Sequence, residues 1–462
     1  MSKNSVYWSV LASLALAGTM IVNAVVAQDP APINTIQSSD KLTITLRAKL
    51  PDYRGPSRFF GRKALITFSP DGSLAAMSGK GGTITIWDTE TGELKATLKN
   101  DKDEVSGFSF SPDGRLAATR NYVDKSVRLW EVGSWKLIAT LPGRKRNFET
   151  RFKAGYGLEE EFGPVPFSPD GNSILSERED DIVSVSEVSH GQERMTLKHD
   201  TPGSGVKGTA KMFLGGPRHF LILQTGYSSD GRWIFTINGD KSAKIWDAAD
   251  GRLKTTITNN ERIYHARFSP DSTALLTVEW QGGLKLWDVE TGERRGSIAR
   301  KGRRGDMNGF EFAPDGRTIA TFSGRDIQLW NVKTAELLFN LPKSEGSDVS
   351  FSPDGHWLAS ASNDQRTAGK LWNVETGELK LALPPIGSKT SSVVFNADGS
   401  ILATSNGKGV MLWDPQTGTL LARLDEARYP VAFSRDGRTL MTGGRNDTAL
   451  LWKVEPKTLA HR

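Results

Sequence analysis

The side chains that most often carry chemistry are absent from this chain or lie at spacings that do not form a site. It contains no cysteine, which excludes disulfides, thiolate zinc ligands and cysteine nucleophiles. No nucleophile–base motif is present. The histidines show no metal-site spacing; they are His190, His199, His219, His265, His356 and His461. We therefore predict no catalytic residue, no metal and no cofactor.

One glycine motif imitates a cofactor-binding sequence. Gly203, Gly205 and Gly208 match the spacing of the dinucleotide-binding fingerprint. That fingerprint acts between a strand and a helix, where the N-terminus of the helix meets the pyrophosphate. No helical pattern follows Gly208, so the match does not predict a nucleotide site.

Two long segments suggest a binding surface. Residues 144–156 combine basic and aromatic side chains, and residues 203–218 combine basic residues with glycines; Arg303 and Arg304 add a further basic pair. Arginine and aromatic side chains are enriched at binding hot spots, and long loops are more often functional than short ones. The predicted partner-binding residues are Arg144, Lys145, Arg146, Phe148, Arg151, Phe152, Tyr156, Lys207, Lys211, Arg218, Arg303 and Arg304.

A repeated unit supplies the framework for these segments. An aromatic residue stands just before a turn of the type Ser-Pro-Asp-Gly in nine places: Phe68, Phe110, Phe167, Tyr227, Phe268, Phe312, Phe351, Phe395 and Phe433. Each is followed at similar spacing by a Trp or its substitute: Trp87, Trp130, Ser186, Trp246, Trp287, Trp330, Trp372, Trp413 and Trp452. Such periodicity indicates a repeat architecture.

Each unit has the pattern of four short strands. The aromatic residue ends the first strand, and Ser69-Pro70-Asp71-Gly72 is typical of a tight turn. A short apolar second strand and an alternating third strand follow, and the segment after the Trp reads as a hairpin. No stretch has sustained helical periodicity, so we predict an all-β protein.

A four-stranded sheet of this size cannot bury its faces alone, so the sheets must stack on one another. Each large Trp side chain fills the space between two sheets. We predict a structural role for Trp87, Trp130, Trp246, Trp287, Trp330, Trp372, Trp413 and Trp452.

The order Phe-Ser-Pro-Asp-Gly, Leu-Ala, then Ile/Leu-Trp-Asp resembles the WD-repeat β-propeller family. The resemblance covers residues 41–455, and repetition makes it strong although each copy is weak. It departs from the family in having no Gly-His pair, and the Asp that precedes the Trp in many WD repeats is matched only at Asp124, Asp180 and Asp240.

The resemblance implies a single β-propeller of about nine four-stranded blades. Eight blades is the alternative, with the Ser186 unit degenerate. Residues Lys41 to Leu50 read as a fourth strand without the first three, and the last unit ends after its third strand. We therefore expect the N-terminal strand to complete the last blade and close the ring.

In WD-repeat propellers the loops between strands two and three, and between successive blades, share one face. Here those loops are basic, as at Arg54, Lys80, Arg120, Arg178, Lys241, Arg262, Arg300, Arg366, Lys408, Arg428 and Arg445. The opposite turns are acidic, as at Asp71, Asp88, Glu90 and Asp113. A ring of like charge attracts anions. The alternative is that the acidic residues only form turns and the basic ones balance them.

These features predict a non-catalytic, monomeric scaffold whose protein partner is acidic at the contact. One alternative is a quinoprotein-like enzyme, because Asp-x-x-Thr-Gly occurs at residues 88–92, 288–292 and 414–418. The Trp of that docking motif is replaced by Ala96, Gly296 and Ala422. Another is a binder of an anionic polymer; we expect no nucleic-acid partner, because the chain is predicted to be exported.

The N-terminus predicts that export. Residues 1–27 combine Lys3, an apolar run and a small-residue exit at Ala27, which is typical of a signal peptide or, as an alternative, a membrane anchor. The predicted location is periplasmic, extracellular or on the outer side of the inner membrane, and membrane contact is expected only through that anchor. Residues 28–40 read as a linker, 41–455 as the propeller and 456–462 as a tail.

Overall fold

Every regular element among the described residues is a β-strand, as the sequence pattern predicts. The computed structural model describes residues 41–51, 53, 66–79, 82–99, 105–143, 165–179, 181–199, 222–238, 241–279, 283–298, 309–322, 326–341, 348–362 and 366–456. The predicted signal or anchor segment and linker lie outside these residues. Their assignment stays a prediction.

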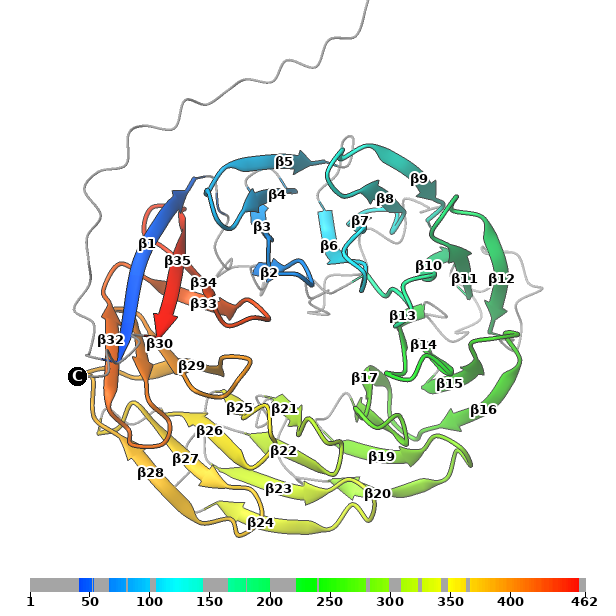
Figure 1. The fold of residues 1–462 in the computed structure, drawn as a ribbon. Helices are drawn as coiled ribbons and strands as arrows, with labels where there is room; N and C mark the ends of the chain where they lie inside the picture. Colours follow the sequence, from blue (N-terminus) through cyan, green and yellow to red (C-terminus); the bar gives the residue numbers. More distant parts are fainter. Residues whose placement is uncertain are drawn as a thin grey trace, which may run out of the picture. The chain divides into compact units, whose positions relative to one another are not determined.

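The strands form nine antiparallel sheets that follow one another around a ring (Figure 1). We number these blades in chain order. Blade 1 is β2 (Ile66–Phe68), β3 (Leu74–Gly79), β4 (Thr83–Asp88) and β5 (Leu94–Leu98). Blade 2 is β6 (Val105–Phe110), β7 (Leu116–Asn121), β8 (Val127–Glu131) and β9 (Leu137–Leu141). Blade 3 is β10 (Ser173–Glu179), β11 (Ile182–Glu187) and β12 (Glu193–Lys198).

The next three blades repeat the same meander. Blade 4 is β13 (Ile222–Tyr227), β14 (Trp233–Asn238), β15 (Ser242–Asp247) and β16 (Leu253–Thr258). Blade 5 is β17 (Ile263–Phe268), β18 (Ala274–Glu279), β19 (Leu284–Asp288) and β20 (Arg294–Ile298). Blade 6 is β21 (Gly309–Phe312), β22 (Thr318–Phe322), β23 (Ile327–Asn331) and β24 (Leu337–Leu341).

The last three blades bring the chain back to its first strand. Blade 7 is β25 (Val349–Phe351), β26 (Trp357–Ala361), β27 (Gly369–Asn373) and β28 (Leu379–Leu383). Blade 8 is β29 (Thr390–Phe395), β30 (Leu402–Asn406), β31 (Val410–Trp413) and β32 (Leu420–Leu424). Blade 9 is β33 (Arg428–Phe433), β34 (Thr439–Gly443), β35 (Ala449–Pro456) and the N-terminal β1 (Leu42–Leu50). The predicted nine-bladed propeller is confirmed.

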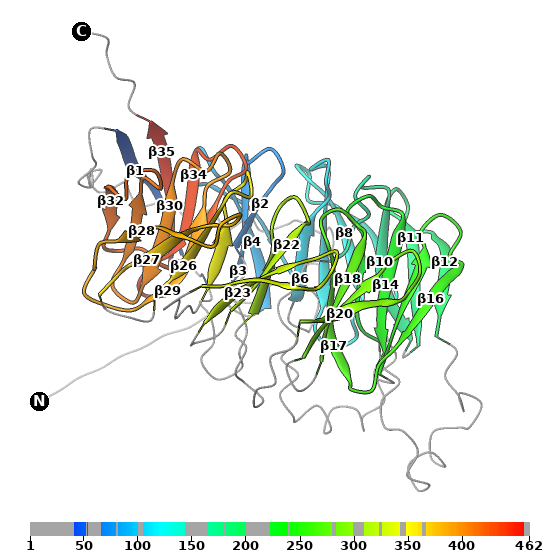
Figure 2. The same ribbon diagram turned by 90° about the horizontal axis from the view of Figure 1, so that it is seen from below.

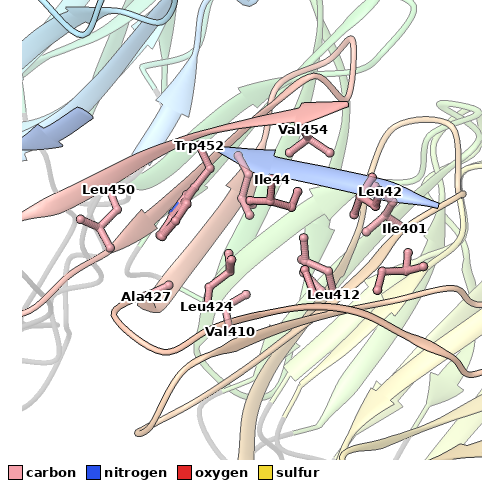
Figure 3. Packing of buried hydrophobic residues seen from close by; sticks show 14 residues of the cluster. Leu42, Ile44, Ile401, Val410, Leu412, Leu424, Ala427, Leu450, Trp452 and Val454 are labelled. Carbon is pink, nitrogen blue, oxygen red and sulfur yellow. The ribbon is translucent and has the colours of Figure 1, made fainter. Parts of the chain in front are cut away.

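The N-terminal strand closes the ring as predicted. β1 pairs antiparallel with β35, from Leu42 opposite Pro456 to Leu50 opposite Ala449. Figure 3 shows its side chains Leu42 and Ile44 in one cluster with Trp452 of blade 9 and Leu412 of blade 8. A strand from the start of the chain thus binds the last blade and packs against the blade before it.

Polar contacts fasten β1 to the blades on both sides. Toward blade 8, Lys41 pairs with Asp414 at 3.1 Å. Toward blade 1, the Arg47 guanidinium donates to the carbonyl of Thr89 at 2.7 Å and pairs with Glu90 at 2.9 Å. The closing strand is therefore held across both interfaces of its blade.

Blade 3 differs from the four-stranded prediction. Its first strand is reduced to a single bridge between Phe167 and Ile174, and β10, β11 and β12 complete the described sheet. Pro166 has no backbone N–H to give to a ladder, which shortens a strand at that point. Buried Ser186 stands where the other blades have Trp. The core between blades 2 and 3 is built instead from aliphatic residues such as Leu129 and Ile174.

A hydrogen bond fixes most of the blade tryptophans. The indole N–H donates to a hydroxyl on the neighbouring second strand, two residues beyond the position opposite the Trp. The pairs are Trp130–Thr119, Trp246–Thr236, Trp287–Thr277, Trp330–Thr321, Trp372–Ser360, Trp413–Thr404 and Trp452–Thr442. In blade 1 this position is Met77, and the buried Trp87 indole has no acceptor among the described residues.

The turn between the third and fourth strands locks each blade onto its predecessor. In blades 3 to 8 the last residue of this turn has positive φ and packs on the third residue of the preceding outer strand, so it is usually Gly, as Gly377 is against Phe339. Blade 6 has Ala335 there, with φ of 56°. The facing residue of blade 5 is Gly296, where an added Cβ would stand 2.5 Å from the Cβ of Ala335. At this contact the turn residue carries the methyl group and the strand residue is the glycine, the reverse of the usual arrangement.

This exchange predicts coupled stabilities. Gly296→Ala should destabilise the fold by about 1–3 kcal/mol, because an extra carbon is forced into a packed contact. Ala335→Gly in the same chain should restore most of the loss, and urea unfolding of the four variants measures this coupling. Gly407→Ala is the matched control, since its Cβ would meet nothing within 4 Å. Additive losses in the double variant would contradict the contact.

Each turn between the first and second strands is organised by its carboxylate. Ser69 Oγ donates to Asp71 at 2.5 Å, and the Ser73 N–H donates to the same oxygen at 3.1 Å. The same serine bond, opposed by partial desolvation, holds the pKa of Asp71, Asp113, Asp170 and Asp354 below the usual value. These acidic residues therefore serve the turns themselves.

The lowered pKa values predict a loss of stability in acid. A carboxylate with a depressed folded-state pKa stabilises the fold above its unfolded pKa, about 3.9, and this contribution disappears as the pH falls through the folded value. The variant Asp113→Asn/Asp170→Asn/Asp354→Asn should be less stable at neutral pH and lose less stability between about pH 5 and 3. Urea midpoints across this range measure both effects.

The control removes three exposed carboxylates of the other turns, by Glu93→Gln, Glu293→Gln and Glu336→Gln. It should keep the pH dependence of the parent. If the two triple variants behave alike, the turn carboxylates do not carry the acid sensitivity.

Candidate partner-binding face

The antiparallel meander places the loops of every blade at two opposite ends. Turns between strands one and two, and between three and four, lie at one end, which we call the turn face. Hairpins between strands two and three, and the links between blades, lie at the other, which we call the loop face. Figure 2 turns the ring so that the blades are seen from the side. The sequence predicts partner binding at the loop face.

The predicted contact residues lie outside the residues that the structure describes. These are Arg144, Lys145, Arg146, Phe148, Arg151, Phe152, Tyr156, Lys207, Lys211, Arg218, Arg303 and Arg304. Their role stays a prediction. The loop face of blades 8 and 9 is described, and it carries three of the basic residues assigned to this face from the sequence: Lys408, Arg428 and Arg445.

Arg428 begins β33 opposite Gly443, and its head is fixed by backbone carbonyls. Its Nη1 donates to the carbonyl oxygens of Lys408 at 2.9 Å, Asp425 at 2.7 Å and Ala427 at 2.6 Å. Carbonyl groups orient a guanidinium without cancelling its charge. The nearby carboxylates are engaged elsewhere, Asp425 with Arg423 at 2.6 Å and Glu426 with Lys49 at 2.7 Å.

Arg445 brings a second positive charge next to Arg428. It lies in the hairpin between β34 and β35, whose central residues Asn446 and Asp447 both have φ of 56°. The Gly444 N–H donates to the Thr448 carbonyl at 2.7 Å and closes the turn around Arg445. Partial burial and then the charge of Arg445 lower the pKa of Arg428, with Asp425 and Glu426 opposing the shift. Within the described chain no carboxylate forms an ion pair with Arg428 or Arg445.

Lys408 and Tyr429 complete the exposed surface around these arginines. Lys408 lies in the hairpin of blade 8, where Asn406 Oδ1 accepts its backbone N–H at 2.7 Å. Tyr429 follows Arg428 directly and is 37% exposed. We call Lys408, Arg428, Tyr429 and Arg445 the basic patch. Its guanidinium groups can bind a carboxylate or phosphate.

The contact that His199 makes between blades was not predicted from the sequence, which shows His199 only as a histidine without metal-site spacing. His199 is fully buried, and its Nε2 lies 2.5 Å from Thr236 Oγ1, which also accepts the indole N–H of Trp246 at 2.9 Å. It follows the outer strand of blade 3 and links that blade to blade 4. The search for a Gly-His pair missed it because Lys198 precedes it. Its position directly after an outer strand was the available signal.

A charged network occupies the next interface at the same position. Asn259 follows the outer strand of blade 4 and donates to Glu279 Oε1 at 2.5 Å. Glu279 also pairs with Lys285 at 2.5 Å, and both side chains are nearly buried. These contacts join blades 4 and 5, so the ionisable groups are used within the fold.

No three His, Asp or Glu side chains gather in a metal-binding arrangement in the described ranges.

No helix among the described residues is long and apolar enough to span a membrane.

Comparison with known proteins agrees with the repeat pattern. The family model "WD domain, G-beta repeat" matches residues 64–88, 92–131, 251–288 and 343–367. The chain is similar to the Periodic tryptophan protein 2 homolog of Schizosaccharomyces pombe, with 27% identity over 61% of this chain and 33% of that protein. It thus spans about a third of that relative's length.

Two further relatives match a larger share of their own length. Transducin beta-like protein 2 of Mus musculus is 23% identical over 70% of this chain and 73% of that protein. Small ribosomal subunit protein RACK1y of Oryza sativa subsp. japonica is 26% identical over 52% of this chain and 76% of that protein.

The comparison contradicts the predicted export. A relative named as a ribosomal subunit protein belongs inside the cell, which points away from a periplasmic or extracellular location or one on the outer side of a membrane. The predicted location is therefore wrong. It rested on the apolar run of residues 6–26, and the hydropathy of such a run does not specify the compartment of the folded domain.

Proposed function

Because this chain is a WD-repeat β-propeller, we propose that it is a non-catalytic scaffold that binds a partner protein through its loop face. The observation that carries the proposal is the basic patch. Arg445 is close enough to Arg428 for its charge to lower the pKa of Arg428, and the carboxylates of Asp425 and Glu426 pair with Arg423 and Lys49. Like charges in close contact are unfavourable, and an anionic ligand relieves this repulsion.

The partner is acidic where it contacts the loop face. Carboxylates of a protein segment can accept the free N–H groups of Arg428 and Arg445, and Tyr429 adds a contact of the kind enriched at interfaces. The sequence assigns the predicted contact residues of the two long segments to the same face. The proposed surface therefore extends from the basic patch toward the connections before and after blade 3.

The residues that suggested a quinoprotein-like enzyme have structural roles in a turn. In Asp-x-x-Thr-Gly at residues 88–92, Asp88 Oδ1 accepts the N–H groups of Glu90 at 3.0 Å and Thr91 at 2.8 Å. Gly92 packs on Ala48 of the closing strand. Both ends of the motif thus serve the turn and the blade contact, so they lend no support to a cofactor site.

Binding to an acidic probe tests the proposal. The full chain should bind a fluorescent oligoglutamate peptide, and the double variant Lys408→Ser/Arg445→Ser should bind it on the order of tenfold more weakly, as two charged contacts are lost. Titration at low and moderate salt should show weaker binding at higher salt, because exposed charges are screened over about 8–10 Å. Arg144→Ser/Arg146→Ser/Arg151→Ser tests the first long segment in the same way.

The control is Arg438→Ser, which removes an exposed arginine from the turn face of blade 9. It should bind like the parent, and all variants should keep the unfolding midpoint of the parent. Loss of binding in the control alone would place the contact on the turn face. Tighter binding of a single-stranded oligonucleotide of equal charge would favour the anionic-polymer alternative over a protein partner.

A further inference from the structure

The outer strands of the blades differ in how they protect their free edges. Within the described chain each outer strand pairs with one neighbour only, so its other edge is open. Charged residues on an open edge prevent pairing with another chain. Seven outer strands carry such residues, for example Lys95 in β5, Arg194 in β12, Lys254 in β16, Arg295 in β20, Lys380 in β28, Arg423 in β32 and Arg47 in β1.

The outer strands of blades 2 and 6 have no charged residue. β9 reads Leu-Ile-Ala-Thr-Leu and β24 reads Leu-Leu-Phe-Asn-Leu. At the second position, where Lys95, Lys254 and Lys380 stand in other blades, these strands have Ile138 and Leu338, which are 38% and 40% exposed. Each therefore presents two adjacent apolar side chains beside an unpaired backbone edge.

The turn that leads into β9 also differs from the other turns. Trp135 occupies the turn position that is Gly in most blades and has φ of 56°, a conformation that a bulky side chain rarely adopts. Its ring packs against the core between blades 1 and 2 and is only partly buried. Leu137, 42% exposed, and Ile138 follow directly. In blade 6 the equivalent residue is the small Ala335.

We propose that β9 is the pairing strand of a homodimer, in which the β9 edges of two copies join antiparallel about a two-fold axis. When a strand pairs with the same strand of a second copy, each residue lies opposite a residue of the same sequence. A charged strand would therefore bring like charges together. With the axis at Ala139, Leu137 lies opposite Leu141 and Ile138 opposite Thr140. The two four-stranded blades then form one continuous sheet.

The occupant is a second copy because uncharged β9 complements itself, whereas the charged edges around the ring do not. Five paired residues from each copy cover less surface than a standard stable interface. The dimer is therefore weak and forms as concentration rises. The sequence alone favoured a monomer, since it does not show that Leu137 and Ile138 are exposed on a free edge.

Sedimentation over a concentration series tests the dimer with the full chain. The parent should show a reversible monomer–dimer equilibrium, and Ile138→Lys should raise the dissociation constant on the order of tenfold or more, because a lysine on the edge opposes pairing. Other blades carry lysine at this position, so the variant should keep the fold, which its unfolding midpoint checks. Leu338→Lys is the matched control on β24 and should dimerise like the parent.

Cysteine cross-linking tests the register, because the natural chain has no cysteine. Under mild oxidation, a mixture of Ile138→Cys and Thr140→Cys proteins should form covalent dimers faster than either protein alone. A parent that stays monomeric at its highest soluble concentration would overturn the proposal. So would a dimer that is weakened by Leu338→Lys and unaffected by Ile138→Lys, since β24 would then be the pairing edge.

Discussion

Burial between neighbouring blades is the constraint on which the whole structure depends. Each sheet has two apolar faces, and the nine core clusters each combine residues of two adjacent blades. No blade can therefore complete its core without a neighbour on both sides. Closure by β1 meets this condition for the first and last blades, because its residues Ile44 and Leu50 face opposite neighbours.

The same constraint decides which polar groups remain for binding. On the turn face, Asp71 and its counterparts bond their own turns, and Arg47 reaches the next blade. Between blades, His199 and Glu279 are buried in contacts that join the sheets. On the described loop face, Arg428 and Arg445 keep charges that no described carboxylate pairs with. We therefore propose that binding takes place at the loop face, where the charges of Arg428 and Arg445 are not used in ion pairs with described carboxylates.

Periodicity made the architecture predictable, whereas its exceptions were not. The spacing of aromatic residues and tryptophans indicates nine blades, and residues 41–50 indicate the closing strand. The shortening of the first strand of blade 3 to one bridge among the described residues depends on Pro166 and on packing that spacing does not encode. The hydrogen bond of His199 to Thr236 was not predicted, because Lys198 stands where a Gly-His pair would have Gly and because Thr236 is distant in sequence. The predicted contact residues stay untested, and the location was wrong because an apolar segment does not identify a compartment.

The contact between Gly296 and Ala335 matches blade 6 specifically to blade 5. Most interfaces place the small residue in the turn of the following blade, whereas this one places it in the strand of the preceding blade. A copy of blade 6 inserted elsewhere would bring Ala335 against a residue larger than Gly, and a copy of blade 5 would leave a gap beside a Gly. Blades that look interchangeable in sequence are thus matched to their neighbours, and shuffling them would require compensating changes at each new junction.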